Sequence, residues 1–176
     1  MKKNVIFLFL MIAIIIDNNT SAQNKAKHAI KEKMVAGSTY FIDQYDSSAR
    51  IENKNGKFLQ LIKENKKQCE YDVLDNDNHE FDQARKNVVK SVFSDARIKQ
   101  LSESGKNNFV VICICNRVGE IKAVHFIRVN TSVITIQDIK ALEDKYLKLK
   151  VKTQNTVCPE TEYFQFVFPV RFKDYL

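Results

Sequence analysis

An apolar run over residues 109–115 constrains the fold of this chain more than any other stretch of its sequence. The run reads FVVICIC and is rich in β-branched side chains, which favour a pleated, buried surface over a helix. Successive side chains of a strand point to opposite faces, and here both faces are apolar. Because a strand that is apolar on both faces must be covered on both sides, we predict that residues 109–116 form a central strand of a sheet.

A second strand is expected after a tight turn. Gly119 supplies the positive φ that a short hairpin turn requires. Residues 121–129 mix apolar and charged side chains, which predicts one dry face, one wet face and a bulge near Ala123. A half-wet strand beside a fully apolar one is typical of a position near the sheet edge. The residues of this strand that we expect to meet a binding partner are Lys122, Val124, Phe126 and Arg128.

The first 22 residues have the pattern of a secretory signal peptide. Lys2 and Lys3 precede twelve uninterrupted apolar residues that end at Ile16, and small residues lead up to Ala22. This run is shorter than the roughly 20 apolar residues that a spanning helix needs, so cleavage after Ala22 is favoured over a membrane anchor. We therefore expect a periplasmic or secreted mature chain that begins near Gln23 and is not embedded in the membrane.

The basic residues of the chain are scattered rather than gathered at one place. The formal net charge is +7, with 28 Lys and Arg against 21 Asp and Glu. Scattered charge favours a solvated surface over a specific site for an anionic partner such as a polysaccharide or a lipid headgroup. Export and the lack of an aromatic RNA-binding motif argue against nucleic acid as a partner.

Residues 23–80 are predicted to form a β-rich region that ends in an acidic loop. A short basic helix is expected over residues 25–35 and a strand over 39–45, and Asn55-Gly56 is a strong hairpin signal. The polar segment 65–80 has alternating Asp residues like a calcium-binding loop, but the ligand and glycine positions that should follow do not match. A solvated acidic loop is therefore the better interpretation.

The helices of the C-terminal part are marked by their capping residues. Two helical pieces are expected over residues 81–104, with Ser94 as the cap of the second piece. A longer helix is expected over residues 136–149, because its apolar residues recur at helical spacing. Thr135 and Asp138 form a variant of the capping box at its start.

The last strand completes a simple order of elements. Residues 163–172 alternate sharply between apolar and other side chains, which predicts a strand. Pro169 cannot donate a hydrogen bond to a neighbouring strand, so it should lie at an edge or a bulge. Because a helix joins the strand at 121–129 to this one, the two can lie parallel on either side of the central strand.

This C-terminal part resembles the C-terminal domain of TonB-type energy transducers. The apolar strand, Gly119 and the apolar residues after it, the helix ITIQDIKALE and the final Val170-Arg171-Phe172 carry the resemblance. It implies a scaffold of this type and a tendency to pair a sheet edge with an extended peptide. The chain departs from the transducers in its cleavable signal and in having only two prolines, where they keep a membrane anchor and a proline-rich spacer. It also resembles uncharacterised exported families of gut-dwelling bacteria.

These patterns together predict an α+β fold. We expect a small antiparallel or mixed sheet with helices on one face, TonB C-terminal-like, together with an N-terminal β-hairpin region. The chain should divide into a signal peptide (1–22), a β-rich region with its acidic loop (23–80) and an α-β-β-α-β region (81–176). Residues 23–176 are expected to form one compact unit, since the mature chain has the length of one domain.

Four cysteines, Cys69, Cys113, Cys115 and Cys158, allow three pairings in an oxidising compartment. Cys113 and Cys115 point to the same face of one strand, so a bond between them would be strained. They fit small buried hydrophobic residues better than a redox or metal pair, because zinc sites usually show C-x2-C spacing with further ligands nearby. If a disulfide forms, Cys69–Cys158 is the expected one.

No catalytic, cofactor-binding or metal-binding constellation stands out in the sequence. A Cys–His nucleophile pair would need Cys113 or Cys115 beside His125, but reactive thiols need an accessible site and this run is apolar. We therefore expect no enzyme and no cofactor. The predicted function is an exported binding or assembly module of the bacterial cell envelope that meets an envelope protein or peptide through a sheet edge. An exported hydrolase or thiol enzyme with a dispersed site is the alternative, and a purely structural envelope subunit is a third interpretation.

Overall fold

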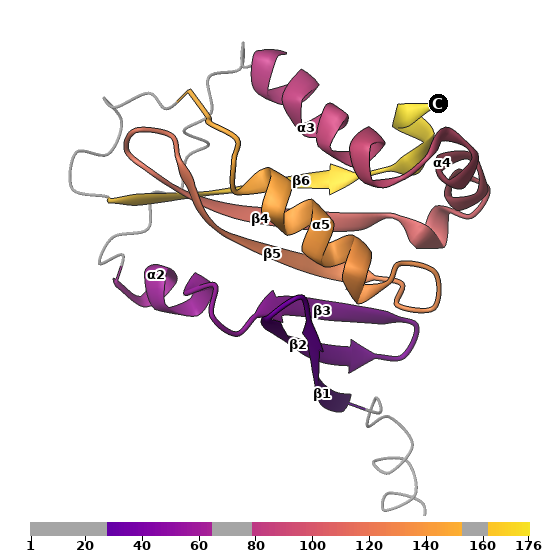
Figure 1. Cartoon of the computed structure of the whole chain (residues 1–176), viewed down its shortest axis with the longest axis horizontal. Coiled ribbons are helices and arrows are strands. Elements are labelled where there is room, and N and C mark those ends of the chain that lie inside the picture. The colour runs from indigo at the N-terminus through magenta and orange to yellow at the C-terminus, as the bar shows by residue number, and fades with distance from the viewer. Residues whose placement is uncertain (1–27, 65–78, 153–161) are drawn as a thin grey trace, which may run out of the picture.

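The computed structural model describes residues 28–64, 79–152 and 162–176 (Figure 1). The proposed signal peptide, most of the acidic loop and the disulfide expected between Cys69 and Cys158 lie outside the described residues. Within the described part, none of the helices is long and apolar enough to cross a membrane.

A six-stranded antiparallel sheet forms the centre of the molecule, and the class is α+β, as predicted. The strands follow the order β1-β2-β3-β5-β4-β6. Their bounds are β1 His28–Val35, β2 Ser38–Tyr45, β3 Ser48–Asn53, β4 Phe109–Asn116, β5 Ile121–Val129 and β6 Tyr163–Val170. The helices are α2 Phe58–Glu64, α3 His79–Val92, α4 Asp95–Ser102 and α5 Ile136–Tyr146, with 3-10 turns η1 Gly105–Asn107 and η2 Phe172–Tyr175.

The two faces of the sheet are covered unequally. Helices α3, α4 and α5 pack on one face over the main core, and Figure 1 shows α3 and α5 along that side of β4 and β6. On the second face, Phe58 and Leu61 of α2 form a small cluster with Ile114 and Ala123. Since Ile114 belongs to this cluster and both neighbouring cysteines belong to the main core, β4 is apolar and buried on both faces, as predicted.

The predicted order of the last three strands is confirmed. β4 lies between β5 and β6 and is antiparallel to both, so β5 and β6 run parallel on either side of it. The caps expected from the sequence are also present: Ser94 accepts a hydrogen bond from the backbone of Arg97, and Thr135 and Asp138 form a capping box. Helix α5 connects β5 to β6 and covers the sheet.

The expectation that β5 lies near the sheet edge is wrong, because β3 pairs with its other side. Lys122, Val124, Phe126 and Arg128 therefore do not form an edge, and Val124 and Phe126 are buried in the main core. Bulges explain the misleading pattern. The partners of Ile114 and Cys115 are Ala123 and Ile121, which leaves Lys122 as an extra residue and confirms a bulge near Ala123.

A second bulge lies at Arg128. Residue Ala49 pairs with Val129 and Ile51 pairs with Phe126, so two residues of β5 oppose Arg50 alone. Arg128 has a φ of 61°, a left-handed backbone that costs roughly 1–2 kcal/mol for a residue other than glycine. Lys122 and Arg128, two of the residues that suggested a wet face, are thus both bulge residues.

The expected helix over residues 25–35 is wrong in the described part, where residues 28–35 form β1. A two-residue turn at Ala36 and Gly37, with φ values of 47° and 78°, folds β1 back onto β2. The hairpin expected at Asn55-Gly56 is also wrong, because the chain leaves β3 there and enters α2. The β-rich character of this region is confirmed, and β1, β2 and β3 extend the main sheet.

Candidate functional site

The two edges of the sheet are β1 and β6, and they differ in how open they are. Pro169 lies in β6, which confirms its predicted edge position. Proline is tolerated in an edge strand where its nitrogen faces away from the neighbouring strand, so the outer side of β6 lacks one donor at this residue. Proline on an edge strand hinders the addition of another strand. The β6 edge is therefore protected at this point.

The β1 edge carries no such proline. β1 pairs with β2 over all eight residues, from His28 opposite Tyr45 to Val35 opposite Ser38. In an antiparallel ladder, alternate residues point their N–H and C=O groups toward the partner and away from it. Counted from the pair that closes the two-residue turn, the outward groups belong to Ile30, Glu32 and Met34. These groups form an open row onto which another strand could add.

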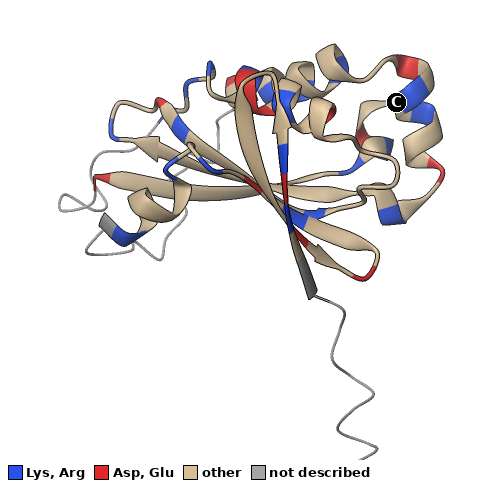
Figure 2. Cartoon of the chain, turned by 60° about the horizontal axis from the view of Figure 1, so that its bottom comes forward, with Lys and Arg blue, Asp and Glu red and all other residues tan. Residues whose placement is uncertain are grey.

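The side chains of the β1 edge alternate in charge, and Figure 2 shows the basic and acidic bands along this strand. Lys31, Glu32 and Lys33 are all exposed, and they are flanked by Ile30 and Met34 with 65% and 74% of their surface exposed. An edge that combines open backbone groups with exposed apolar residues is suited to binding an extended segment.

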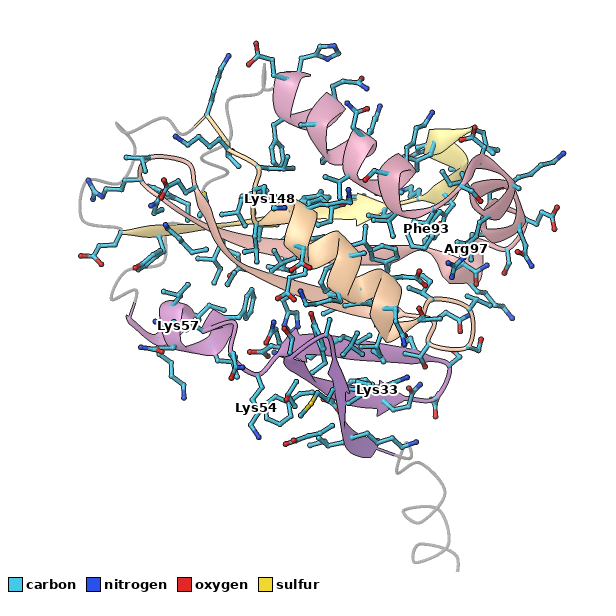
Figure 3. All side chains as sticks on the ribbon, in the orientation of Figure 1. Lys33, Lys54, Lys57, Phe93, Arg97 and Lys148 are labelled. Atoms are coloured by element: carbon cyan, nitrogen blue, oxygen red, sulfur yellow. The ribbon has the colours of Figure 1, made fainter. Side chains whose placement is uncertain are left out.

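Glu32 already has an ion-pair partner. Its carboxylate lies 3.2 Å from Nζ of Lys54, and that ammonium group lies 5.2 Å from the centre of the Phe41 ring. Lys33 and Lys54 project from this part of the sheet in Figure 3. Within the described part of the chain, Lys31 and Lys33 make no ion pair. Among the residues that the structure describes, this edge therefore presents Lys31 and Lys33 without an ion pair and Glu32 paired with Lys54.

A polar cluster lies on the second face of the sheet. Arg50 donates from Nε to Nε2 of His125 at 2.9 Å, and Glu52 Oε2 lies 3.5 Å from His125 Nδ1. The His125 ring is 1% exposed and stacks on Phe58 with ring centres 4.6 Å apart. These contacts tie β3, β5 and α2 together.

The geometry of this cluster is that of a structural network rather than a catalytic one. Because Nε2 accepts from Arg50, a neutral His125 carries its proton on Nδ1, which makes no hydrogen bond within the described structure. A general base must come within hydrogen-bond reach of a substrate, and this buried ring is closed to solvent.

The cysteines of β4 and His125 lie on opposite faces of the sheet. His125 pairs with Ile112, so it shares a face with Ile112 and not with Cys113 or Cys115. Both thiols are free and buried, and burial raises the pKa of Cys113 well above its usual value and that of Cys115 to about 12. The Cys–His pair considered from the sequence is therefore not assembled, and a thiolate is disfavoured at both positions.

Two buried polar clusters hold α5 in place. Tyr40 and Asn53 both donate hydrogen bonds to Oε2 of Glu143, which is 3% exposed. Arg97 donates hydrogen bonds to both carboxylate oxygens of Asp138, from Nη1 to Oδ1 at 2.9 Å and from Nη2 to Oδ2 at 2.7 Å. The first cluster joins α5 to β2 and β3, and the second joins it to α4. Their contacts are internal to the fold, so they stabilise it rather than form an open site.

A depression of about 230 Å³ lies beside the β4–β5 turn and the start of β6. It is lined by Asn116, Arg117, Val118, Glu162 and Tyr163 and includes neither His125 nor the cysteines of β4. Across residues 28–64, 79–152 and 162–176, no group of three or more His, Cys, Asp or Glu could hold a metal ion.

Sequence reasoning missed the β1 edge, and the missed residues include Lys31, Glu32 and Lys33. The alternation of basic and acidic residues at 31–33 was the available signal, because a period of two indicates a strand. It was outweighed by apolar residues whose spacing also fits a helix. The expected binding residues of β5 share the sheet with this edge but are separated from it by β2 and β3.

No family model matches the chain, and no curated protein matches it. Among solved structures, the chain is similar to the crystal structure of a DUF5043 family protein from Bacteroides uniformis. The two share 17% sequence identity over 81% of this chain and 85% of the other, with a TM-score of 0.62. At this identity the likeness shows the fold alone. The neighbour belongs to an uncharacterised family, and the comparisons do not confirm the resemblance to TonB-type domains.

Proposed function

We propose that this chain is an exported, non-enzymatic binding module of the bacterial cell envelope. Its partner would be an envelope protein that adds an extended segment to the edge of β1. The observation that carries the proposal is the open row of backbone groups on β1, since its side chains are exposed and the opposite edge is blunted by Pro169.

Two further features support a binding role. The sequence of the C-terminal part resembles TonB-type domains, which pair a sheet edge with an extended peptide, and this chain would share that habit at a different strand. The signal-like N-terminus supports export, and we expect the protein recovered from the periplasm or the medium to begin at Gln23 on N-terminal sequencing.

The enzyme alternative has less support from the geometry. A thiol enzyme needs an accessible, electropositive cysteine, whereas Cys113 and Cys115 are buried and their pKa values are raised. His125 is 1% exposed and is engaged by Arg50. A purely structural subunit would use the same edge, so its partner would be a permanent one.

Site-specific crosslinking tests the proposal. A photoreactive residue is placed at Ile30, which is 65% exposed, and the mature protein is crosslinked in its native envelope. Glu32→Pro removes an outward N–H without removing a bond to β2, whereas Glu32→Ala removes the same side chain and keeps that N–H. With the photoreactive residue at position 30 in both variants, we expect Glu32→Ala to crosslink to one envelope protein and Glu32→Pro to show no such crosslink. Equal capture by both variants would contradict strand addition at β1.

A further inference from the structure

The charges on β1 limit which extended segment its edge can accept, an inference that rests on the proposed function. Lys31 and Lys33 share one face of the sheet, because they pair with Ile42 and Tyr40, and Tyr40 is buried against α5. Two residues of a strand that share a face are about 7 Å apart. Neither lysine has an ion-pair partner in the described residues, so acidic residues of an added strand can pair with both ammonium groups.

The other face of β1 sets a different requirement. Ile30, Glu32 and Met34 share it, and Glu32 is already paired with Lys54. The exposed side chains of Ile30 and Met34 would be covered by apolar residues of an added strand. The residue of the added strand that lies opposite Glu32 can be small and polar, because Lys54 already pairs with the Glu32 carboxylate.

From this pattern we infer that the partner segment carries two acidic residues separated by one residue, with an apolar residue on each side. In an antiparallel arrangement its acidic residues stand directly opposite Lys33 and Lys31, and its apolar residues stand opposite Met34 and Ile30. Cross-strand pairs of opposite charge stabilise a sheet and pairs of like charge destabilise it. The ligand class is thus an acidic, alternating β segment of another protein.

A second copy of β1 does not meet this requirement. If two copies of β1 pair as antiparallel strands, a two-fold axis perpendicular to the sheet relates them. Because opposing residues must point to the same face, one residue of β1 then lies opposite its own copy at the axis. An axis at Lys31 or at Lys33 sets that lysine against its own copy. An axis at Glu32 sets the two Glu32 residues together and each Lys31 against a Lys33. Lysines on edge strands are a common protection against such self-pairing.

Short capped peptides test the inference on the full mature protein. The first contains Val-Glu-Thr-Glu-Val, the second replaces both glutamates with lysine, and the third, Val-Glu-Glu-Thr-Val, sets the glutamates on opposite faces. Affinity is measured by fluorescence anisotropy at low salt, and hydrogen exchange of the amides of Ile30, Glu32 and Met34 reports where the peptide binds. We expect the first peptide to bind about tenfold more tightly than either of the others.

Charge reversal supplies the matched variants. In Lys31→Glu/Lys33→Glu the preference should invert, so that the lysine peptide binds more tightly than the glutamate peptide. Lys99→Glu/Lys173→Glu changes the net charge by the same amount at two exposed positions on α4 and η2, and it should keep the original preference. A preference that changes equally in both double variants would show a general charge effect and overturn the inference.

The outcomes separate this inference from the proposed function. If the envelope partner still crosslinks to β1 while the three peptides bind equally or none binds, the charge pattern is wrong and strand addition stands. If crosslinking no longer distinguishes Glu32→Pro from Glu32→Ala, both proposals fall. Protection of the three outward amides by the first peptide, together with loss of that protection at Ile30 and Met34 in Glu32→Pro, would support both.

Discussion

At the scale of single residues, the pKa values of the two buried carboxyl groups of α5, Asp138 and Glu143, are shifted in opposite directions. Burial acts to raise the pKa of Asp138, but hydrogen bonds from Arg97 and Thr135 outweigh it and hold this pKa below its usual value. For Glu143 burial prevails over the hydrogen bonds from Tyr40 and Asn53, and the pKa is raised. In α5, therefore, the surroundings of Asp138 favour its ionised form, and the surroundings of Glu143 favour its protonated form.

Asp138→Asn removes the ion pair with Arg97 and should lower the free energy of unfolding by about 1–3 kcal/mol at pH 7. Because the folded pKa is depressed, this contribution is present above the unfolded value of 3.8 and is lost as the pH falls through the folded pKa. Urea unfolding from pH 7 to pH 3 checks this. Asp144→Asn, at an exposed pair with Lys140, should change stability by no more than about 0.5 kcal/mol.

Glu143→Gln should show the opposite pH dependence. A raised folded pKa means that Glu143 contributes most stability below its unfolded value of 4.5 and loses it as the pH rises through the folded pKa. The glutamine variant does not titrate, so its stability relative to the native protein should increase over that rise and then level off. Equilibrium unfolding at several pH values measures this difference, and a decrease would contradict the assignment. Glu143→Ala, which removes the acceptor of the buried Tyr40 and the half-buried Asn53, should be destabilised at every pH.

Cys113 and Cys115 should resist alkylation in the native protein. Burial removes access to both thiols and raises the pKa values that govern thiolate formation. Iodoacetamide treatment at mildly alkaline pH, followed by peptide mass spectrometry, should modify neither residue without denaturant and both with it. Rapid modification of either one in the native state would revive the thiol-enzyme alternative.

At the scale of elements, the β4–β5 turn is held by a close approach of two backbones. Gly119 has a φ of 80°, and Val151 donates a backbone hydrogen bond to its carbonyl oxygen at 2.8 Å. A Cβ added at Gly119 would lie 1.8 Å from the oxygen of Val151. The turn glycine is needed both for its backbone conformation and for the space that it leaves to the chain after α5.

Gly119→Ala and Gly37→Ala separate these two needs. Gly37 also has a positive φ, of 78°, but an added Cβ there meets nothing within 4 Å. Gly37→Ala should cost about 1 kcal/mol for the conformation alone, and Gly119→Ala should cost about 2 kcal/mol or more, because backbone must also move. Thermal and urea unfolding of both variants check the order. Equal losses would show that the contact with Val151 is easily relieved.

Elements differ in how far their sequence predicted them. β4, α4 and α5 were predictable because apolar spacing and caps such as Ser94 and Thr135 are local signals. β1 was not, since Ala29, Ile30, Met34 and Val35 fit helical spacing equally well, and pairing with β2 makes it a strand. Asn55-Gly56 marks a real change of direction, with Gly56 donating to the Asn53 carbonyl at 2.9 Å, but the next apolar residues form a helix.

At the scale of the whole molecule, the edge strands β1 and β6 are the places where a second copy of the protein could extend the sheet. Pro169 blunts the β6 edge, and antiparallel two-fold pairing of β1 about Lys31, Glu32 or Lys33 opposes like charges. We expect the mature protein to be monomeric by light scattering at micromolar concentration. Lys31→Val/Lys33→Val removes the repulsion and exposes an apolar edge, so it should form dimers or larger species. A native dimer abolished by Glu32→Pro would contradict this prediction.

The sequence by itself determined the elements whose pattern is local: a strand apolar on both faces, a hairpin turn at Gly119, capped helices and a proline confined to an edge. Tertiary structure alone decided that β1, β2 and β3 extend the sheet beyond β5, because the pairing of β3 with β5 joins segments far apart in the chain. That pairing buries one side of β5, the strand expected to bind, and leaves β1 at the edge. Bulges at Lys122 and Arg128 hid the buried character of β5, since an extra residue breaks the alternation from which burial is inferred.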